Sequence, residues 1–279
     1  MKERVTLTLD QDILKEVDSK VDGFTIKNRS HAIELMLMRS LGNTVPKTAL
    51  ILAGGKGVRL QPITYEIPKP LMLVHDRTLL EHSFDLFKKY NIKNIILSIG
   101  YKGDKIRQAI GDGRKFGVKV TYVEEDTPMG TGGAIKLAEP LLKEPFICCN
   151  ADELKELDLM DMFMSHRDNK AAVTIALTSV EDPSMYGVAS LQGNRILEFV
   201  EKPPKESAPS KLINSGLYIM EPSVFSYIPS GREVSLEKEV FPRLASEGRL
   251  FGYPFSGQWY NTGTMELYED SIKKWKDIT

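Results

Sequence analysis

A glycine-rich turn follows a short apolar run near residue 50, and two cations come after it. The run Ala49–Leu52 leads into AGGKGVRL at 53–60, and Lys69 stands between two prolines ten residues after Arg59. Glycines let backbone N–H groups approach phosphate oxygens closely. The turn lacks the Gly-Lys-Ser/Thr of a Walker loop and the third glycine of a dinucleotide fingerprint. The pattern therefore predicts a triphosphate site, and a surface loop with ordinary cations is the alternative.

A second candidate group is Asp152, which follows the apolar run 146–149. Ligands of parallel sheets bind at the carboxyl ends of strands. A carboxylate at that position suits a Mg²⁺ ion that bridges two phosphates. The alternative is that Asp152 caps a helix over 154–159.

The elements that must position these groups alternate between strands and helices from Lys47 onward. Apolar runs predict strands over 48–52, 94–99, 118–123 and 145–149. Amphipathic patterns predict helices over 79–90, 102–110 and 133–142, and a last helix over 264–278. This alternation is typical of an α/β fold with a mostly parallel sheet flanked by helices.

Composition excludes several classes of protein. The chain has 279 residues, of which 42% are hydrophobic and 27% charged, with a formal net charge of −1. No global basic field exists to hold nucleic acid, so a polyanion must meet local cations or a metal. The adjacent Cys148 and Cys149 cannot form a disulfide framework, which predicts a reducing cytoplasm. No apolar run is long enough for a membrane span.

Residues 1–43 predict a separate small unit, with 44–47 as a linker to the domain at 48–279. Val5, Leu7 and Leu9 alternate with polar residues, as in a half-buried strand. Asp10 and Ser30 are placed to cap two helices. A unit of this size buries too little surface alone, which favours pairing with a second copy.

This unit resembles the ribbon-helix-helix family through RVTLTL at 4–9 and NRSHA at 28–32. The resemblance implies a homodimer with an antiparallel ribbon, with a tetramer left open. It also implies DNA contacts by Arg4, Thr6 and Thr8 in the major groove and a phosphate contact near Ser30. Residues 1–46 carry seven basic and seven acidic side chains, so a dimer clamp without DNA binding is the alternative.

Residues 48–275 resemble the sugar-1-phosphate nucleotidyltransferase family. The motifs, in order, are LAGGKGVRLQPITYEIPKPL at 52–71, EEDTPMGTGGA at 124–134, NAD at 150–152, YGV at 186–188, FVEKP at 199–203, NSG at 214–216 and SLEKEVFP at 235–242. The mannose-1-phosphate guanylyltransferase branch is the most similar. The resemblance implies a Rossmann-like, GT-A-like fold and Mg²⁺-assisted in-line displacement on a nucleoside triphosphate by a sugar 1-phosphate, without a covalent intermediate.

The resemblance also implies roles for individual residues. The implied catalytic residues are Arg59, Lys69, Asp152 and Lys202, and the implied metal ligands are Asp152 and Asn261. The implied nucleotide-binding residues are Leu52, Ala53, Gly54, Gly55, Gly57, Glu125, Gly130 and Thr131. The implied sugar-binding residues are Gly187, Glu201, Asn214 and Gly216.

The resemblance implies that Glu125 faces the base of the nucleotide, and the chemistry of its side chain then indicates which base. A carboxylate only accepts hydrogen bonds, and guanine offers paired donors at N1 and N2, which favours GTP. The alternative is that Glu125 is a solvated member of the charged run 124–126. Mannose 1-phosphate is the favoured sugar substrate.

Two positions depart from the family pattern. Val58 replaces a hydroxyl residue, and Asn261 replaces the second metal carboxylate. An amide oxygen can still ligate Mg²⁺, but it lacks the charge. These changes leave open a second class of function, a DNA-binding regulator whose degenerate domain senses a sugar phosphate or nucleotide sugar.

Overall fold

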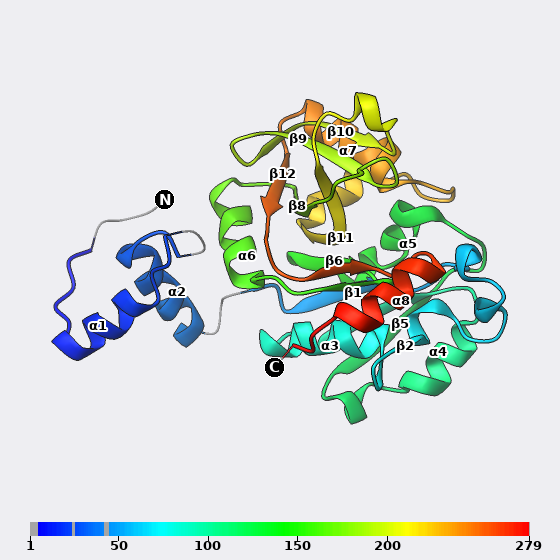
Figure 1. The fold of residues 1–279 in the computed structure, drawn as a ribbon, viewed down its shortest axis with the longest axis horizontal. Helices are drawn as coiled ribbons and strands as arrows, with labels where there is room; N and C mark the ends of the chain where they lie inside the picture. Colours follow the sequence, from blue (N-terminus) through cyan, green and yellow to red (C-terminus); the bar gives the residue numbers. More distant parts are fainter. Residues whose placement is uncertain (1–4, 24–25, 42–44, 279) are drawn as a thin grey trace. The chain divides into compact units, whose positions relative to one another are not determined.

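The computed structural model describes residues 5–23, 26–41 and 45–278. The chain divides into two compact units, Met1–Thr44 and Val45–Thr279, coloured from blue to red along the sequence in Figure 1. Arg4, which is expected to contact DNA, and Thr44 of the expected linker lie outside the described residues.

The small unit contains two helices, α1 (Gln11–Ser19) and α2 (Arg29–Leu41). Asp10 caps α1 as predicted, since its carboxylate accepts a hydrogen bond from the Asp12 N–H at 2.8 Å. The predicted cap at Ser30 is wrong. The amide oxygen of Asn28 accepts from the His31 N–H at 3.0 Å instead, and α2 has already begun at Arg29. Residues 5–10 form no strand within the single chain.

The large unit is built on a mixed sheet. Within residues 45–278, nine strands pair in the order β5-β4-β1-β6-β11-β8-β12-β10-β9. Their bounds are β1 Thr48–Leu52, β4 Asn94–Ile99, β5 Lys119–Glu124, β6 Phe146–Asn150, β8 Val173–Ser179, β9 Gly187–Gln192, β10 Arg195–Glu201, β11 Leu212–Met220 and β12 Leu250–Pro254. Two further pairs are β2 (Leu73–Val74) with β3 (Arg77–Thr78), and β7 (Glu153–Lys155) with β13 (Trp259–Asn261).

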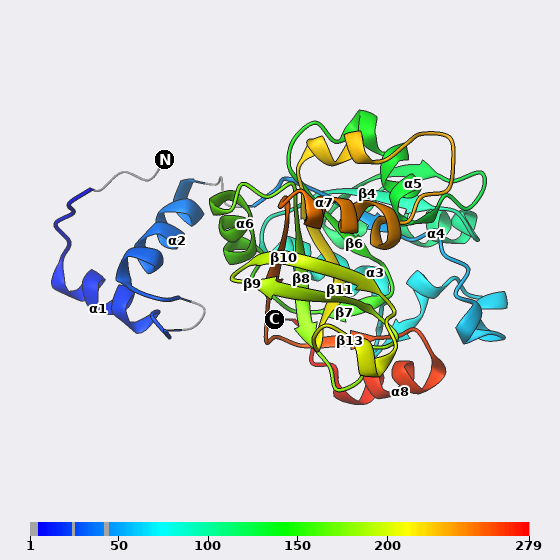
Figure 2. The same ribbon diagram turned by 90° about the horizontal axis from the view of Figure 1, so that it is seen from above.

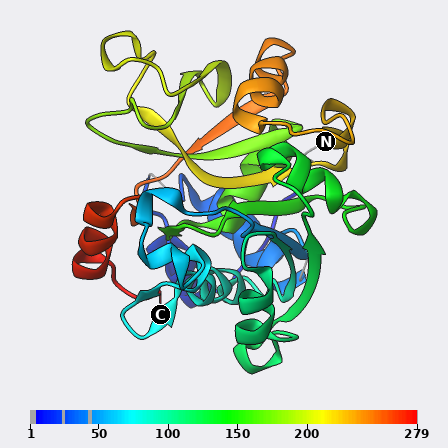
Figure 3. The same cartoon turned by 90° about the vertical axis from the view of Figure 1, so that its right-hand side faces the viewer.

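The expectation of a mostly parallel sheet holds for only half of it. Strands β5, β4, β1 and β6 pair in parallel. Beyond β6 the neighbours are antiparallel, except for β8 with β12. An additional pairing of β9 with β11 closes the last five strands into a ring. Figure 3 shows the yellow and orange elements of this ring grouped above the cyan and green elements of the parallel half.

Helices cover both faces of the sheet. They are α3 (Leu79–Lys89), α4 (Gly103–Ile110), α5 (Gly130–Leu137), α6 (Leu159–Asp168) and α7 (Phe241–Ser246), while α8 (Met265–Lys274) packs against β13. Phe84 of α3, Ile106 of α4 and Phe163 of α6 share one apolar core, whereas Ile135 of α5 and Phe241 of α7 belong to the other. Within the described part of the chain, no helix is long and apolar enough to cross a membrane.

The strands β1 and β4 have the predicted bounds, whereas β5 and β6 each begin and end one residue later than predicted. The alternative of a helix after Asp152 is wrong. Residues 153–155 form β7, and the next helix, α6, is capped by Asp158, whose carboxylate accepts from the Met160 and Asp161 N–H groups.

Candidate active site

The glycine loop leaves the carboxyl end of β1. Backbone contacts fix it: the Ala53 N–H donates to the Ser98 carbonyl at 2.7 Å, and the Gly54 carbonyl accepts from the Tyr101 N–H at 3.1 Å. Gly57 has a φ of 62°, a conformation that favours glycine. A short 3₁₀ turn, Val58–Leu60, then carries Arg59.

Lys69 and Asp152 form the central polar contact of the site. The Nζ atom of Lys69 lies 2.6 Å from Oδ2 of Asp152, although 83 residues separate them. The Lys69 side chain is 7% exposed and that of Asp152 is 38% exposed. Burial raises the pKa of Asp152, but the charges of Lys69, Lys155 and Arg59 outweigh it, and the pKa lies below its ordinary value. Asp152 is therefore a carboxylate at neutral pH.

The antiparallel pair β7–β13 brings Asn261 to the same place. Asn261 lies opposite Glu153 in this pair, and both the N–H and the hydroxyl of the next residue, Thr262, donate to the Asp152 carbonyl. The Asn261 amide oxygen accepts from the Gly263 N–H at 2.5 Å. A Cβ on Gly263 would lie 2.8 Å from Nη2 of Arg59, so the guanidinium also reaches this turn.

Asp152 and Asn261 carry oxygen atoms of the kinds that bind magnesium. No cluster of three or more His, Cys, Asp or Glu side chains suited to a metal occurs among the described residues. Mg²⁺ sites in nucleotide enzymes use one or two carboxylates, with substrate phosphates and water as the remaining ligands. Asp152 supplies one ionised carboxylate, and Asn261 adds an uncharged oxygen.

Glu125 lies against the glycine loop. Its Oε2 atom accepts from the Met129 N–H at 3.0 Å, and a Cβ on Gly54 would lie 2.5 Å from Oε1. Burial raises the pKa of Glu125, an effect that the Met129 hydrogen bond partly offsets. Glu125 is half-buried, whereas its neighbours Glu124 and Asp126 are exposed.

The next two residues of the expected nucleotide motif are engaged within the fold. Gly130 has a φ of 69°, and a Cβ there would lie 2.5 Å from the Val234 carbonyl. The Thr131 hydroxyl donates to Oε2 of Glu237 at 2.7 Å and accepts from the Leu236 N–H at 2.9 Å. In the isolated chain, this hydroxyl therefore ties α5 to the segment 235–240 and does not point freely to a ligand.

The expected sugar-binding residues lie on β9, β10 and β11. Gly187 pairs with Glu201, and a Cβ on Gly187 would collide with the Phe199 ring. Lys202 has a φ of 50° and places its Nζ 3.3 Å from Oε1 of Glu201. Burial and then the charge of Glu237 raise the pKa of Glu201.

Asn214 and Gly216 form a bulge in β11. The strand's pairing with β8 shifts between Asn214 and Tyr218. The Asn214 side chain donates to the Tyr218 hydroxyl and accepts from the Gly216 N–H, both at 2.9 Å. Asn214 therefore shapes the bulge.

Comparison with known proteins decides the family. A family model described as "Nucleotidyl transferase" matches residues 48–277. The chain belongs to the nucleotidyl transferase family. It is 38% identical over 222 residues to a mannose-1-phosphate guanylyltransferase of Mycobacterium tuberculosis, an alignment that covers 78% of this chain and 61% of that protein.

Solved structures share this α/β fold. A UDP-glucose pyrophosphorylase complexed with UDP-glucose matches with a TM-score of 0.71 and 26% identity, over 82% of this chain and 97% of that one. HddC from Yersinia pseudotuberculosis, complexed with GMP-PN, matches with a TM-score of 0.70 and 28% identity, over 82% of this chain and 99% of that one. The chain spans only 61% to 66% of the length of the curated relatives it matches.

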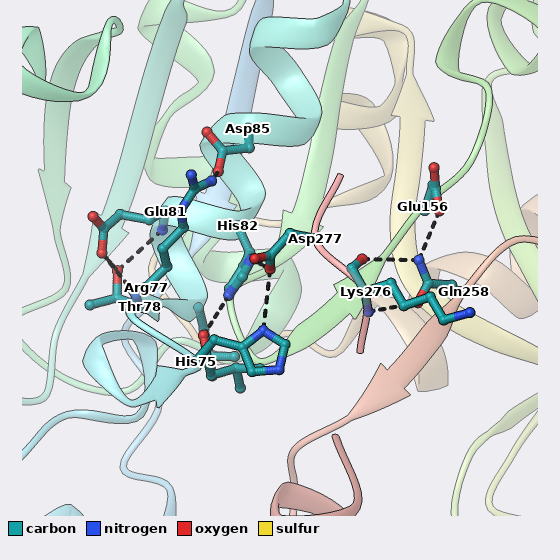
Figure 4. A network of polar contacts seen from close by, with 12 residues as sticks. His75, Arg77, Thr78, Glu81, His82, Asp85, Glu156, Gln258, Lys276 and Asp277 are labelled. Atoms are coloured by element: carbon teal, nitrogen blue, oxygen red, sulfur yellow. Dashed lines mark hydrogen bonds and ion pairs between the residues drawn. The ribbon is translucent and has the colours of Figure 1, made fainter. Parts of the chain in front are cut away.

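The segment after α8 braces β13 in this nucleotidyl transferase. Gln258 exchanges two hydrogen bonds with the backbone of Lys276 and donates a third to Glu156 (Figure 4). Asp277 approaches His75 and His82, at 3.5 and 3.8 Å. Helix α8 packs beside β13 (Figure 2). Sequence analysis missed this brace. It also missed Glu153 and Lys155, because no motif distinguishes them from ordinary charged residues. It assigned no role to Glu237, which lies within the motif at 235–242, or to Thr262, which follows Asn261.

Proposed function

We propose that this protein transfers a nucleotidyl group from a nucleoside triphosphate to a sugar 1-phosphate. GTP and mannose 1-phosphate are the favoured substrates, and the products are a nucleotide sugar and pyrophosphate. The observation that carries the proposal is the convergence of Arg59, Lys69 and Asp152 beside a glycine loop in a nucleotidyl transferase fold. Relatives named mannose-1-phosphate guanylyltransferases support the choice of substrates.

The proposed reaction needs no protein nucleophile. A phosphate oxygen of the sugar 1-phosphate attacks the α-phosphorus and forms the new P–O bond. The bond from that phosphorus to the bridging oxygen breaks, and pyrophosphate leaves with the electron pair. Catalysis then consists of positioning and charge neutralisation.

In the proposed mechanism, different residues of this chain bind and neutralise different phosphates of the two substrates. The glycine loop offers backbone N–H groups to the triphosphate, while Arg59 and Lys69 neutralise the phosphates that leave. Lys202 holds the sugar phosphate, and Glu201 accepts from sugar hydroxyls. Asp152, with Asn261, would hold a Mg²⁺ ion, which supplies charge stabilisation at the phosphates when bound.

Glu125 supports the choice of GTP. Its Oε2 atom holds the Met129 N–H, and its Oε1 atom faces the glycine loop. A half-buried carboxylate beside the loop is a suitable acceptor for the paired donors of guanine. The HddC structure, which is complexed with GMP-PN, provides a solved relative with a guanine nucleotide.

The first test is pyrophosphate release by the purified protein with Mg²⁺, across four nucleoside triphosphates crossed with several sugar 1-phosphates. Release with GTP and mannose 1-phosphate is the expected result. Release with UTP or dTTP instead would retain the transferase and reject the role of Glu125. No release with any pair would reject the catalytic proposal.

For the small unit we propose homodimerisation through residues 1–43. Association of dimers into a tetramer and contact with DNA are further hypotheses. Val5, Leu7 and Ile13 are 71%, 52% and 54% exposed in the single chain, and a ribbon shared with a second copy would cover them. Thr6, Thr8 and the first turn of α2 at Ser30 remain the proposed DNA contacts. Binding of labelled duplex DNA at low salt tests them.

The second candidate function is a regulator that senses a sugar phosphate or nucleotide sugar. The observation in its favour is that residue 261, where the resemblance implies a second carboxylate, is an amide, and that the next residue, Thr262, donates to the Asp152 carbonyl. Asn261→Asp separates the two functions. Increased turnover at limiting Mg²⁺ would support the enzyme, whereas an inactive protein that still binds ligand would support the sensor. The buried free thiols of Cys148 and Cys149 suit the proposed reducing cytoplasm.

A further inference from the structure

A buried ion pair immediately follows Asp152 in the chain, on strand β7. Glu153 and Lys155 point from the same face of β7, with side chains 8% and 4% exposed, and Nζ of Lys155 lies 3.1 Å from Oε2 of Glu153. Fully buried charges are rare, because their desolvation is costly even when they are paired. Neither residue contacts a substrate in the proposed mechanism, although the charge of Lys155 helps to lower the pKa of Asp152. The burial of both charges therefore calls for a further explanation.

The ammonium of Lys155 makes a second contact, with the bulge of β11. It donates to the Gly216 carbonyl at 3.1 Å. Gly216 has a φ of 63°, and a Cβ there would collide with the Glu153 carboxylate. The Gly216 N–H is held by Asn214. Gly216 is thus fixed at its N–H by Asn214, at its carbonyl by Lys155 and at its Cα by Glu153. The last two contacts come from β7.

We propose that Lys155 is a positioning residue that sets the bulge of β11 at a fixed place relative to Asp152. The inference rests on the proposed function and on the implied roles of Asn214 and Gly216 as sugar-binding residues. Strand β7 begins immediately after Asp152 and ends at Lys155, so three residues carry the tether from the carboxylate to the bulge. A displacement of about 1 Å between reacting groups costs up to about a hundredfold in rate, which is why such a tether matters.

A simpler explanation is that Lys155 only neutralises Glu153. The two explanations separate when both charges are removed. Lys155→Met leaves the Glu153 carboxylate unpaired and releases the Gly216 carbonyl. The double variant Glu153→Gln/Lys155→Met also releases the carbonyl, but it leaves no buried charge.

The experiment compares both variants with the full-length wild type and with a matched control, Lys136→Met. Lys136 also pairs with a glutamate, Glu139 at 2.9 Å, and donates to a backbone carbonyl, that of Phe225 at 3.0 Å, yet it contacts no proposed substrate residue. The measurements are the KM for mannose 1-phosphate, the KM for GTP and hydrogen exchange of the amides at 212–218.

We expect both Lys155 variants to raise the KM for mannose 1-phosphate by about tenfold or more and to speed exchange at 214–217. The KM for GTP of the Lys155 variants should stay close to wild type. The KM for mannose 1-phosphate and the hydrogen exchange of Lys136→Met should also stay close to wild type. If Lys155→Met does not fold, the double variant alone decides. Wild-type KM and exchange in the double variant would show that Lys155 is only a counter-charge and would overturn the proposal.

Failure of the proposed function has a different signature. If the wild type turns over no sugar 1-phosphate, the substrate assignment is rejected, while hydrogen exchange still tests the tether. Faster exchange in the bulge of the double variant supports the role of Lys155. Unchanged exchange overturns it.

Discussion

Gly54 and Glu125 show how single residues determine the shape of the candidate nucleotide site. Glu125 can lie against the glycine loop only because residue 54 has no side chain, since a Cβ there would be 2.5 Å from Oε1. The same carboxylate holds the Met129 N–H and so fixes the segment that leads to α5. A glycine in the loop and an acidic residue far along the chain therefore act together.

Gly54→Ala should raise the KM for the nucleoside triphosphate by about tenfold, because the new methyl group displaces Glu125 from the loop. Initial rates of pyrophosphate release measure this. The matched variant is Gly55→Ala, where a Cβ meets nothing within 4 Å. Its effect should be clearly smaller, and equal effects would contradict the steric argument.

The pH dependence of GTP binding should depend on Glu125. Burial raises the pKa of Glu125, and only its ionised form accepts both guanine donors. The KM for GTP should therefore be flat above this raised pKa and should increase as the pH falls through it. Kinetics as a function of pH check this behaviour.

Glu125→Gln provides the control for that pH profile. It should remove the increase at low pH and weaken the preference for GTP over UTP by about tenfold or more. Glu201, whose pKa is also raised by burial, titrates in the same direction. Persistence of the low-pH increase in Glu125→Gln would contradict the role of Glu125, and a parallel profile of the KM for mannose 1-phosphate shows the contribution of Glu201.

At the scale of elements, β13 is held in place by the segment that follows α8. Trp275 is 3% exposed and packs edge-on against His82 at 5.7 Å and against Tyr260 of β13 at 6.2 Å. Because Asn261 follows Tyr260, packing at the end of the chain supports a strand of the candidate active site.

Trp275→Ala should lower the free energy of unfolding of the large unit by about 3–5 kcal/mol, the usual cost of truncating a buried tryptophan. Urea denaturation followed by far-UV circular dichroism measures it. Leu267→Ala on α8, where the side chain is 36% exposed, should cost less than about 1 kcal/mol. A comparable loss in both variants would show that α8 as a whole, and not the Trp275 contact, provides the stability.

Local patterns were sufficient for the parallel half of the sheet but not for the rest. The runs at 48–52 and 94–99 are buried on both faces, so apolar composition alone marks β1 and β4. The ring of β11, β8, β12, β10 and β9 depends on pairing between distant segments, which no local pattern specifies. The position of Asp152 after a buried strand predicts a site residue, whereas no local pattern indicates the contact of Lys155 with a carbonyl 61 residues away. Ser30 and Asn28 both have side chains that can cap a helix. The sequence alone therefore does not show which of the two begins α2.

At the scale of the whole molecule, the two units divide apolar surface differently. The large unit has apolar cores on both faces of the sheet, whereas the small unit buries few apolar side chains and leaves Val5, Leu7 and Ile13 exposed in the single chain. Exposed apolar side chains in a small unit favour association.

Leu7→Ser should convert the proposed dimer to a monomer, because the exposed leucine would be buried in the shared ribbon. Size-exclusion chromatography with light scattering measures the mass. Thr6→Ser, on the opposite side of the alternating segment, should leave the dimer intact. A monomeric wild type would reject dimerisation itself, and the catalytic proposal would be unaffected.

The adjacent cysteines of β6 have a further consequence. Cys148 belongs to the core on one face of the sheet and Cys149 to the core on the other, and burial raises the pKa of both thiols, that of Cys149 to about 12. A thiol reagent should therefore not react with the folded chain. If either cysteine is replaced by alanine, the labelling rate of the other measures how often the core on its own face of the sheet opens. Two adjacent residues thus report separately on the opening of the two cores, one on each face of the sheet.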